Sequence, residues 1–186
     1  YICKAMLHEL FIYAAAMALK NQDWKLFSEL NQKPYFVGDS MLQFNGYQFG
    51  IFSHSRCPYD NEMNKRLSDR QYLCGTAALW TQKINTLCDK ETFAATDSVL
   101  YNISLMSGHA LDLSDANSWI PILYPYVELQ RWRSTDAFSR FAIRLKSKDY
   151  ASHFSNSIGC KTLEDFKEKI RQLRSLKFKR FKFPST

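Results

Sequence analysis

The sequence lacks the short motifs that mark most catalytic sites. It contains no glycine-rich phosphate loop, no G-x-S-x-G nucleophile elbow and no H-E-x-x-H zinc motif. Its five cysteines are scattered, odd in number and never spaced as C-x-x-C, which argues against a disulfide framework and against a zinc ribbon. We therefore expect a non-enzymatic protein without metal or cofactor, located in the reducing cytoplasm.

A long uninterrupted apolar run is also missing. The longest apolar stretch extends from Ala5 to Leu19 and includes two polar residues, so it is shorter than the roughly 20 residues of a membrane-spanning helix. The chain begins at Tyr1, within an apolar helical face and without an initiator Met, and we expect it to be the C-terminal part of a longer protein. Since no repeat or proline-rich linker divides the 186 residues, we predict one domain over residues 1–186.

Helical spacing of apolar residues dominates the chain, and the predicted fold is mainly α, a single compact multi-helix domain. Two segments are candidates for short strands: residues 35–52, an aromatic and glycine-rich stretch that also suits a loop or a short helix, and residues 176–183, where Phe and Lys alternate. Predicted helices cover 6–19, 23–30, 62–87, 89–106, a short segment from Ser114 or Asp115 through Ile122, a segment after Ser134 or Thr135, 149–158, and a segment after Thr162. Asp23, Asp89 and Thr162 are the expected N-terminal caps, and Gly108 and Gly159 the expected ends.

Charge is distributed unevenly along the chain. Residues 1–130 carry a net charge of −3, whereas residues 131–186 carry +10. Such a basic segment raises the expectation of an anionic partner, including nucleic acid. The alternative is a solvated helix face followed by an edge strand that lysines protect from aggregation. The candidate anion or nucleic-acid contacts are Arg140, Arg144, Lys146, Lys148, Lys177, Lys179, Arg180 and Lys182.

A polar pair interrupts the first apolar helix. His8 and Glu9 are adjacent in sequence, and neighbouring positions on a helix point about 100° apart, so they do not converge on one substrate. A buried pair that hydrogen-bonds other segments is one interpretation. Another is a pocket in which these two residues, with Tyr13, Arg66 and Arg70, bind a small anionic signal molecule. Salt bridges from Glu9 to either arginine are the simpler alternative for that set.

Several stretches of the sequence resemble an uncharacterised C-terminal domain of bacterial proteins that begin with a Toll/interleukin-1-receptor-like (TIR) domain. HELFIYAAAMALK (8–20) resembles the opening of that domain, and N-x-R-L-x-x-R-x-x-L-x-x-x-A-x-L (64–79) resembles a later part. The resemblance continues in W-x-P-x-L-Y (119–124) and in FSRFAIRLKSKDY (138–150). None of these stretches is a catalytic motif.

The resemblance implies a non-catalytic regulatory, sensing or oligomerisation module of a bacterial effector of the anti-phage type. Any enzymatic activity would then lie in an N-terminal part that this sequence does not contain. The implied partners are the attached N-terminal effector domain, another protein or a second copy of the chain, and no membrane. Nucleic-acid binding by the basic C-terminal third is the first alternative, and sensing of a small anionic ligand is the second.

Overall fold

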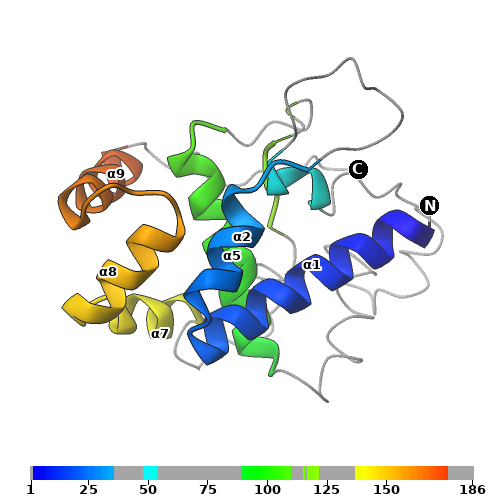
Figure 1. The fold of residues 1–186 in the computed structure, drawn as a ribbon, viewed down its shortest axis with the longest axis horizontal. Helices are drawn as coiled ribbons and strands as arrows, with labels where there is room; N and C mark the ends of the chain where they lie inside the picture. The colour runs from blue at the N-terminus through cyan, green and yellow to red at the C-terminus, as the bar shows by residue number, and fades with distance from the viewer. Residues whose placement is uncertain are drawn as a thin grey trace, which may run out of the picture.

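A computed structural model of the chain describes residues 2–35, 48–53, 89–109, 115, 117–121 and 137–175. These residues form six α-helices and one 3-10 helix and contain no strand (Figure 1). The mainly α fold predicted from the sequence is confirmed. The elements are α1 (Ile2–Asn21), α2 (Trp24–Gln32), η1 (Phe49–Phe52), α5 (Lys90–Met106), α7 (Ala137–Arg144), α8 (Lys148–Ser157) and α9 (Leu163–Ser175).

Side-chain caps set the ends of α2 and α5 as the sequence predicts. Asp23 Oδ1 accepts a hydrogen bond from the Leu26 amide at 3.0 Å, and Asp89 Oδ1 accepts one from the Thr92 amide at 2.8 Å. Each bond satisfies an amide that has no partner within its helix. Gly108 ends α5 with φ +88°, a backbone conformation that favours glycine.

The last two helices begin and end close to the predicted positions. The Ser147 side chain caps α8, so this helix begins one residue before the predicted Asp149. Gly159 follows α8 with φ +78°. Thr162 Oγ1 accepts a hydrogen bond from the Asp165 amide at 3.1 Å, which is one of the two bonds of the predicted capping box. The Asp165 carboxylate accepts its hydrogen bond from the Lys161 amide and not from the Thr162 amide that a capping box would use.

The short helix predicted through Trp119 is wrong for the described residues 115 and 117–121, which form a turn and chain without regular secondary structure. The Trp119 amide donates to Ser104 Oγ at 3.0 Å, and the Ile120 amide donates to Ser53 Oγ at 2.9 Å. Because these amides bond side chains 15 and 67 residues away, they are unavailable for the i to i−4 bonds of a helix.

In the predicted strand region 35–52, Tyr35 lies in an isolated β-bridge, and Phe49–Phe52 form the 3-10 helix η1 in place of a strand. The Ser53 amide donates to the Gly50 carbonyl at 2.8 Å. A Cβ atom at Gly50 would lie only 2.0 Å from the backbone oxygen of Asn117, so glycine is required for this close approach. Residues 36–47, the predicted helix 62–87, the caps Ser134 and Thr135, and the predicted strand 176–183 lie outside the described residues.

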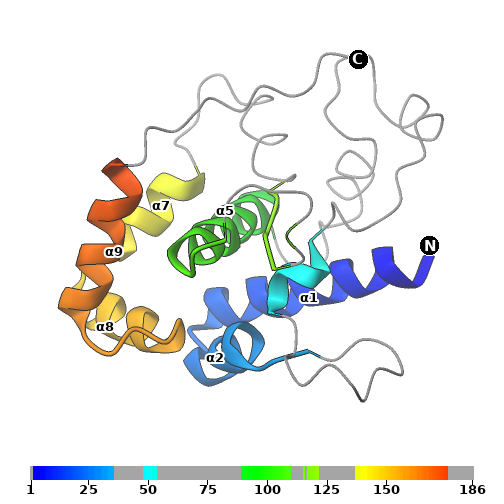
Figure 2. The same cartoon turned by 90° about the horizontal axis from the view of Figure 1, so that it is seen from above.

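The helices pack around a core rich in aromatic rings. α1 pairs with α2 as a hairpin and also packs on α5, while α7 packs on α5 and α9 contacts both α5 and α8 (Figures 1 and 2). Phe11 of α1 stacks on Phe52 at 4.9 Å between ring centroids and contacts Trp119 at 5.8 Å. A second aromatic group, including Phe27 of α2 and Phe154 of α8, joins α2 to the C-terminal helices.

Candidate functional site

A buried polar group lies where α1, η1, α5 and residues 117–121 meet. His8 is 3% exposed, stacks on the Trp119 ring at 5.4 Å, and its Nδ1 pairs with the carbonyl oxygen of Phe52. Trp119 Nε1 donates to Asp97 Oδ1 at 2.8 Å, and Asp97 is 1% exposed. These bonds join four segments of the chain, and their burial leaves the polar atoms out of reach of a substrate.

The pocket predicted from His8, Glu9, Tyr13, Arg66 and Arg70 is not assembled by the described residues. His8 points into the core, Glu9 is half-buried, and Tyr13 packs edge-on against Phe93 at 4.7 Å. Arg66 and Arg70 lie outside the described residues. No part of the structure therefore tests a salt bridge between Glu9 and either arginine.

The basic C-terminal third is only partly described. Arg144, Lys146 and Lys148 are exposed around the junction of α7 and α8. The side chain of Arg140 and the residues Lys177, Lys179, Arg180 and Lys182 lie outside the described part.

Helix α9 carries more of these positive charges, but two of them are paired along the helix. Lys167 Nζ lies 2.6 Å from Glu164 Oε1, and Arg171 Nη1 lies 2.6 Å from Glu168 Oε2. The hydrogen bond and charge of Lys167 lower the pKa of Glu164. The pairing leaves this part of α9 less basic than the sequence suggests.

Directly after α5, His109 lies within ion-pair distance of Asp115. His109 Nδ1 lies 2.8 Å from Asp115 Oδ2, and its buried Nε2 has no hydrogen-bond partner among the described residues. A general base needs an accessible nitrogen near a nucleophile or a substrate, and this nitrogen is enclosed. Nowhere in the described ranges do three or more His, Cys, Asp or Glu side chains gather as a metal site would require.

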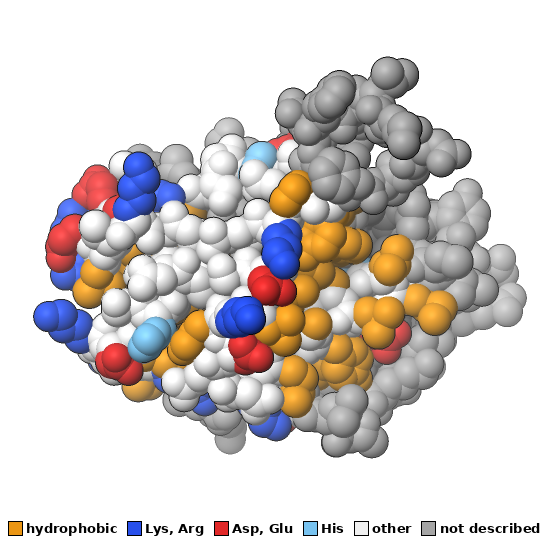
Figure 3. Space-filling view, viewed as in Figure 1, with side chains coloured by type: hydrophobic (Ala, Val, Ile, Leu, Met, Phe, Trp, Pro, Cys, Tyr) orange, Lys and Arg blue, Asp and Glu red, His pale blue; other side chains and the backbone are white. Residues whose placement is uncertain are grey.

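Helix α1 presents an exposed apolar surface at its N-terminal half. Met6, Leu7 and Leu10 are 55%, 50% and 63% exposed, and we call these three residues the α1 patch. Figure 1 shows α1 extending beyond the other described helices, and Figure 3, in the same view, shows hydrophobic side chains gathered on that side of the molecule. The helix is 20 residues long, and none of the described helices combines the length and apolarity needed to cross a membrane.

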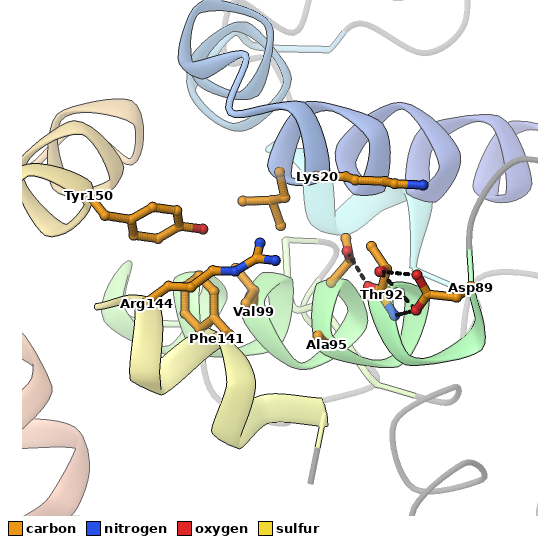
Figure 4. Close-up of a pocket in the computed structure, with 10 residues that line it drawn as sticks. Lys20, Asp89, Thr92, Ala95, Val99, Phe141, Arg144 and Tyr150 are labelled. Atoms are coloured by element: carbon orange, nitrogen blue, oxygen red, sulfur yellow. Dashed lines mark hydrogen bonds between the residues drawn. The ribbon is translucent and has the colours of Figure 1, made fainter. Parts of the chain in front are cut away.

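A cavity of about 150 Å³ opens between α1, α5, α7 and α8 (Figure 4). Leu19, Val99 and Phe141 supply apolar walls, and the charged side chains of Lys20 and Arg144 also line it. No pattern in the sequence indicated this cavity, because its walls come from three parts of the chain that are distant in sequence: the end of α1, α5, and the consecutive helices α7 and α8. Arg144 alone was among the predicted anion contacts.

Comparison with known proteins identifies no function for the α1 patch or for the cavity. No family model matches the chain, and neither a curated protein nor a solved structure matches it. The resemblance to the C-terminal domain of TIR proteins therefore stays a prediction from the sequence.

Proposed function

We propose that the chain is a non-catalytic regulatory module that docks, through the α1 patch, on a protein domain attached to it. The observation that carries this proposal is the exposure of three large apolar side chains on one helix. Met6, Leu7 and Leu10 are each at least half exposed, and contiguous apolar surface of this kind is typical of interaction sites.

Helix α1 has apolar residues on all sides. One face is buried, with Phe11, Ile12 and Ala15 in the core. Leu10 and its neighbours in the α1 patch continue the apolar surface around the helix. A helix that is apolar all round is normally covered on every side, so the exposed half of α1 favours a covering partner.

The expected strength of the contact favours an attached domain over a free partner. Full burial of a Leu or Met side chain contributes about 1.5–3 kcal/mol, so covering the half-exposed α1 patch would contribute roughly 2.5–5 kcal/mol in total. Association of free molecules costs an estimated 4–15 kcal/mol of translational and rotational freedom. A covalently attached domain is present at a high effective concentration. The N-terminal effector that the sequence resemblance to TIR proteins implies would be such a domain.

Leu10→Glu tests the proposal in the full-length protein, which this proposal expects to include an attached effector domain. Ile143→Glu is the matched control, because Ile143 is 59% exposed and lies on α7, away from the α1 patch. Both changes place a charge on the surface, and we expect both variants to keep the helical circular dichroism spectrum. Only Leu10→Glu is expected to alter the activity and assembly state of the attached effector.

Two outcomes would contradict this proposal. Equal behaviour of Leu10→Glu and Ile143→Glu in the full-length protein would show that the α1 patch has no docking role. A stable dimer of the 186-residue chain alone at micromolar concentration, lost in Leu10→Glu, would identify a second copy as the occupant in place of an attached domain.

A further inference from the structure

The cavity between α1, α5, α7 and α8 contains a buried hydroxyl without a partner. Tyr150 of α8 is 8% exposed, and its hydroxyl oxygen makes no hydrogen bond to any described residue. The ring is held edge-on against Trp24 at 4.9 Å and Phe141 at 6.3 Å. The hydroxyl points into the cavity and faces the Arg144 guanidinium (Figure 4).

A buried hydroxyl without a hydrogen bond is costly, because its contact with water is lost on folding and nothing replaces it. A polar group inside the cavity would restore the bond. Burial raises the pKa of the Tyr150 phenol above its ordinary 10.0, and the polar contact and the positive charge of the adjacent Arg144 side chain offset only part of this. The phenol is therefore protonated at neutral pH and donates to whatever occupies the cavity.

Three other polar side chains at the cavity already make hydrogen bonds. Asp89 accepts hydrogen bonds from the amide and the hydroxyl of Thr92 at 2.8 and 2.9 Å, and the Thr96 hydroxyl donates to the Thr92 carbonyl at 2.7 Å. Lys20 lies toward the Asp89 end (Figure 4), and its charge helps to lower the Asp89 pKa. The donors left for a ligand are the Tyr150 hydroxyl, the Arg144 guanidinium and the Lys20 ammonium, and neither cation has a carboxylate partner within the described ranges.

Charge and shape together restrict the ligand. The lining carries two cations, Lys20 and Arg144, and one carboxylate, Asp89, so its net charge of +1 matches a monoanion better than a dianionic phosphate. A guanidinium and an adjacent hydroxyl suit the two coplanar oxygens of a carboxylate. Leu19, Val99 and Phe141 supply an apolar part of the wall beside these polar groups, and about 150 Å³ holds a molecule of roughly the size of benzene.

We infer that this cavity binds a small organic monocarboxylate, with its carboxylate between Tyr150 and Arg144 and its apolar body against Val99 and Phe141. The site is separate from the α1 patch and does not depend on the docking proposal.

Sodium benzoate is the probe, titrated calorimetrically into the 186-residue chain, with benzamide as the neutral ligand of equal shape. We expect benzoate to bind at least about tenfold more tightly than benzamide, since charge-assisted hydrogen bonds are the stronger kind. Tyr150→Phe removes only the hydroxyl, and Arg144→Gln removes the charge. Each variant should weaken benzoate binding at least about tenfold, whereas Arg171→Gln, an exposed arginine of α9, should leave it unchanged.

Thermal unfolding without ligand separates binding from folding. Tyr150→Phe retains the ring contacts and loses an unsatisfied hydroxyl, so its melting temperature should equal or exceed that of the original chain. Absence of benzoate binding at about 10 mM would overturn the inference, and so would tighter binding of inorganic phosphate than of benzoate. It would also be overturned if the Tyr150→Phe or the Arg144→Gln variant bound benzoate as tightly as the original chain does.

Discussion

Replacing Trp119 with phenylalanine tests the buried polar group that joins α1, η1, α5 and residues 117–121. Trp119 is fully buried, and its Nε1 donates to Asp97 Oδ1 at 2.8 Å. Phenylalanine keeps an aromatic ring against His8 but has no donor for Asp97. The carboxylate of Asp97 would then lose one of its hydrogen bonds in a position that is 1% exposed.

Two terms set the expected loss of stability. Removing one partner of a buried hydrogen bond costs about 1–3 kcal/mol. The smaller ring leaves a cavity beside Phe11 and Phe49, and by comparison with other truncations in protein cores we assign it about 1–2 kcal/mol. The sum for Trp119→Phe is roughly 2–5 kcal/mol, a large share of the 5–15 kcal/mol by which folded domains are stable.

Urea unfolding followed by far-ultraviolet circular dichroism measures this loss as a change in the free energy of unfolding. Trp24→Phe is the matched control, because Trp24 is only half-buried and its indole nitrogen makes no hydrogen bond to a described residue. We expect the control to lose about 1 kcal/mol or less. If Trp119→Phe loses no more than Trp24→Phe, the Asp97 bond does not stabilise the fold and the reasoning is refuted.

Gly50→Ala should cost about 3 kcal/mol in the same urea assay, because its Cβ would lie 2.0 Å from the Asn117 backbone oxygen; Gly108→Ala, with φ +88° but open space around it, should cost about 1 kcal/mol. Equal losses would contradict the close approach at Gly50. Asp89→Ala should cost about 1 kcal/mol at neutral pH through the lost cap of α5. Burial alone would raise the pKa of Asp89, but the hydrogen bonds from Thr92 outweigh it and hold the pKa below the ordinary 3.8. The stability that Asp89 contributes is therefore present above pH 3.8 and is lost as the pH falls through the lower folded-state pKa. The original chain and Asp89→Ala should therefore approach the same free energy of unfolding only below pH 3.8. Convergence of the two free energies above that pH would contradict this assignment.

Helix ends were predictable where a neighbouring side chain determines them. Asp23 and Asp89 bond amides three residues ahead, and Gly108 and Gly159 adopt positive φ angles at the ends of α5 and α8. Each of these features depends on a few consecutive residues. Sequence patterns report such local chemistry directly.

Residues 117–121 were mispredicted because their hydrogen-bond partners are remote. The Trp119 amide bonds Ser104, and the Ile120 amide bonds Ser53. The acidic and serine residues ahead of Trp119 are typical of a helix start, and nothing near them in sequence indicates that distant hydroxyls take up these amides. Tertiary contacts override local propensity here.

The cavity could not be predicted from the sequence for the same physical reason, because the residues that form it are remote from one another along the chain. Arg144 was named among basic residues of the C-terminal third, as a contact for nucleic acid or another anion. The sequence indicated no binding role for Tyr150, because a tyrosine in a helix is usually a core residue. Its unpaired hydroxyl becomes apparent only when α5, α7 and α8 are placed together.

The six residues 48–53 restrict which fragments of the chain can fold by themselves. The Phe52 carbonyl pairs with His8 near the start of the chain, while the Ser53 hydroxyl accepts from Ile120. Proteolytic cleavage products that separate α1 from Trp119 would each carry half of an aromatic core and expose it to water. Dissection within the first 121 residues therefore yields no fragment that folds as this part of the chain does.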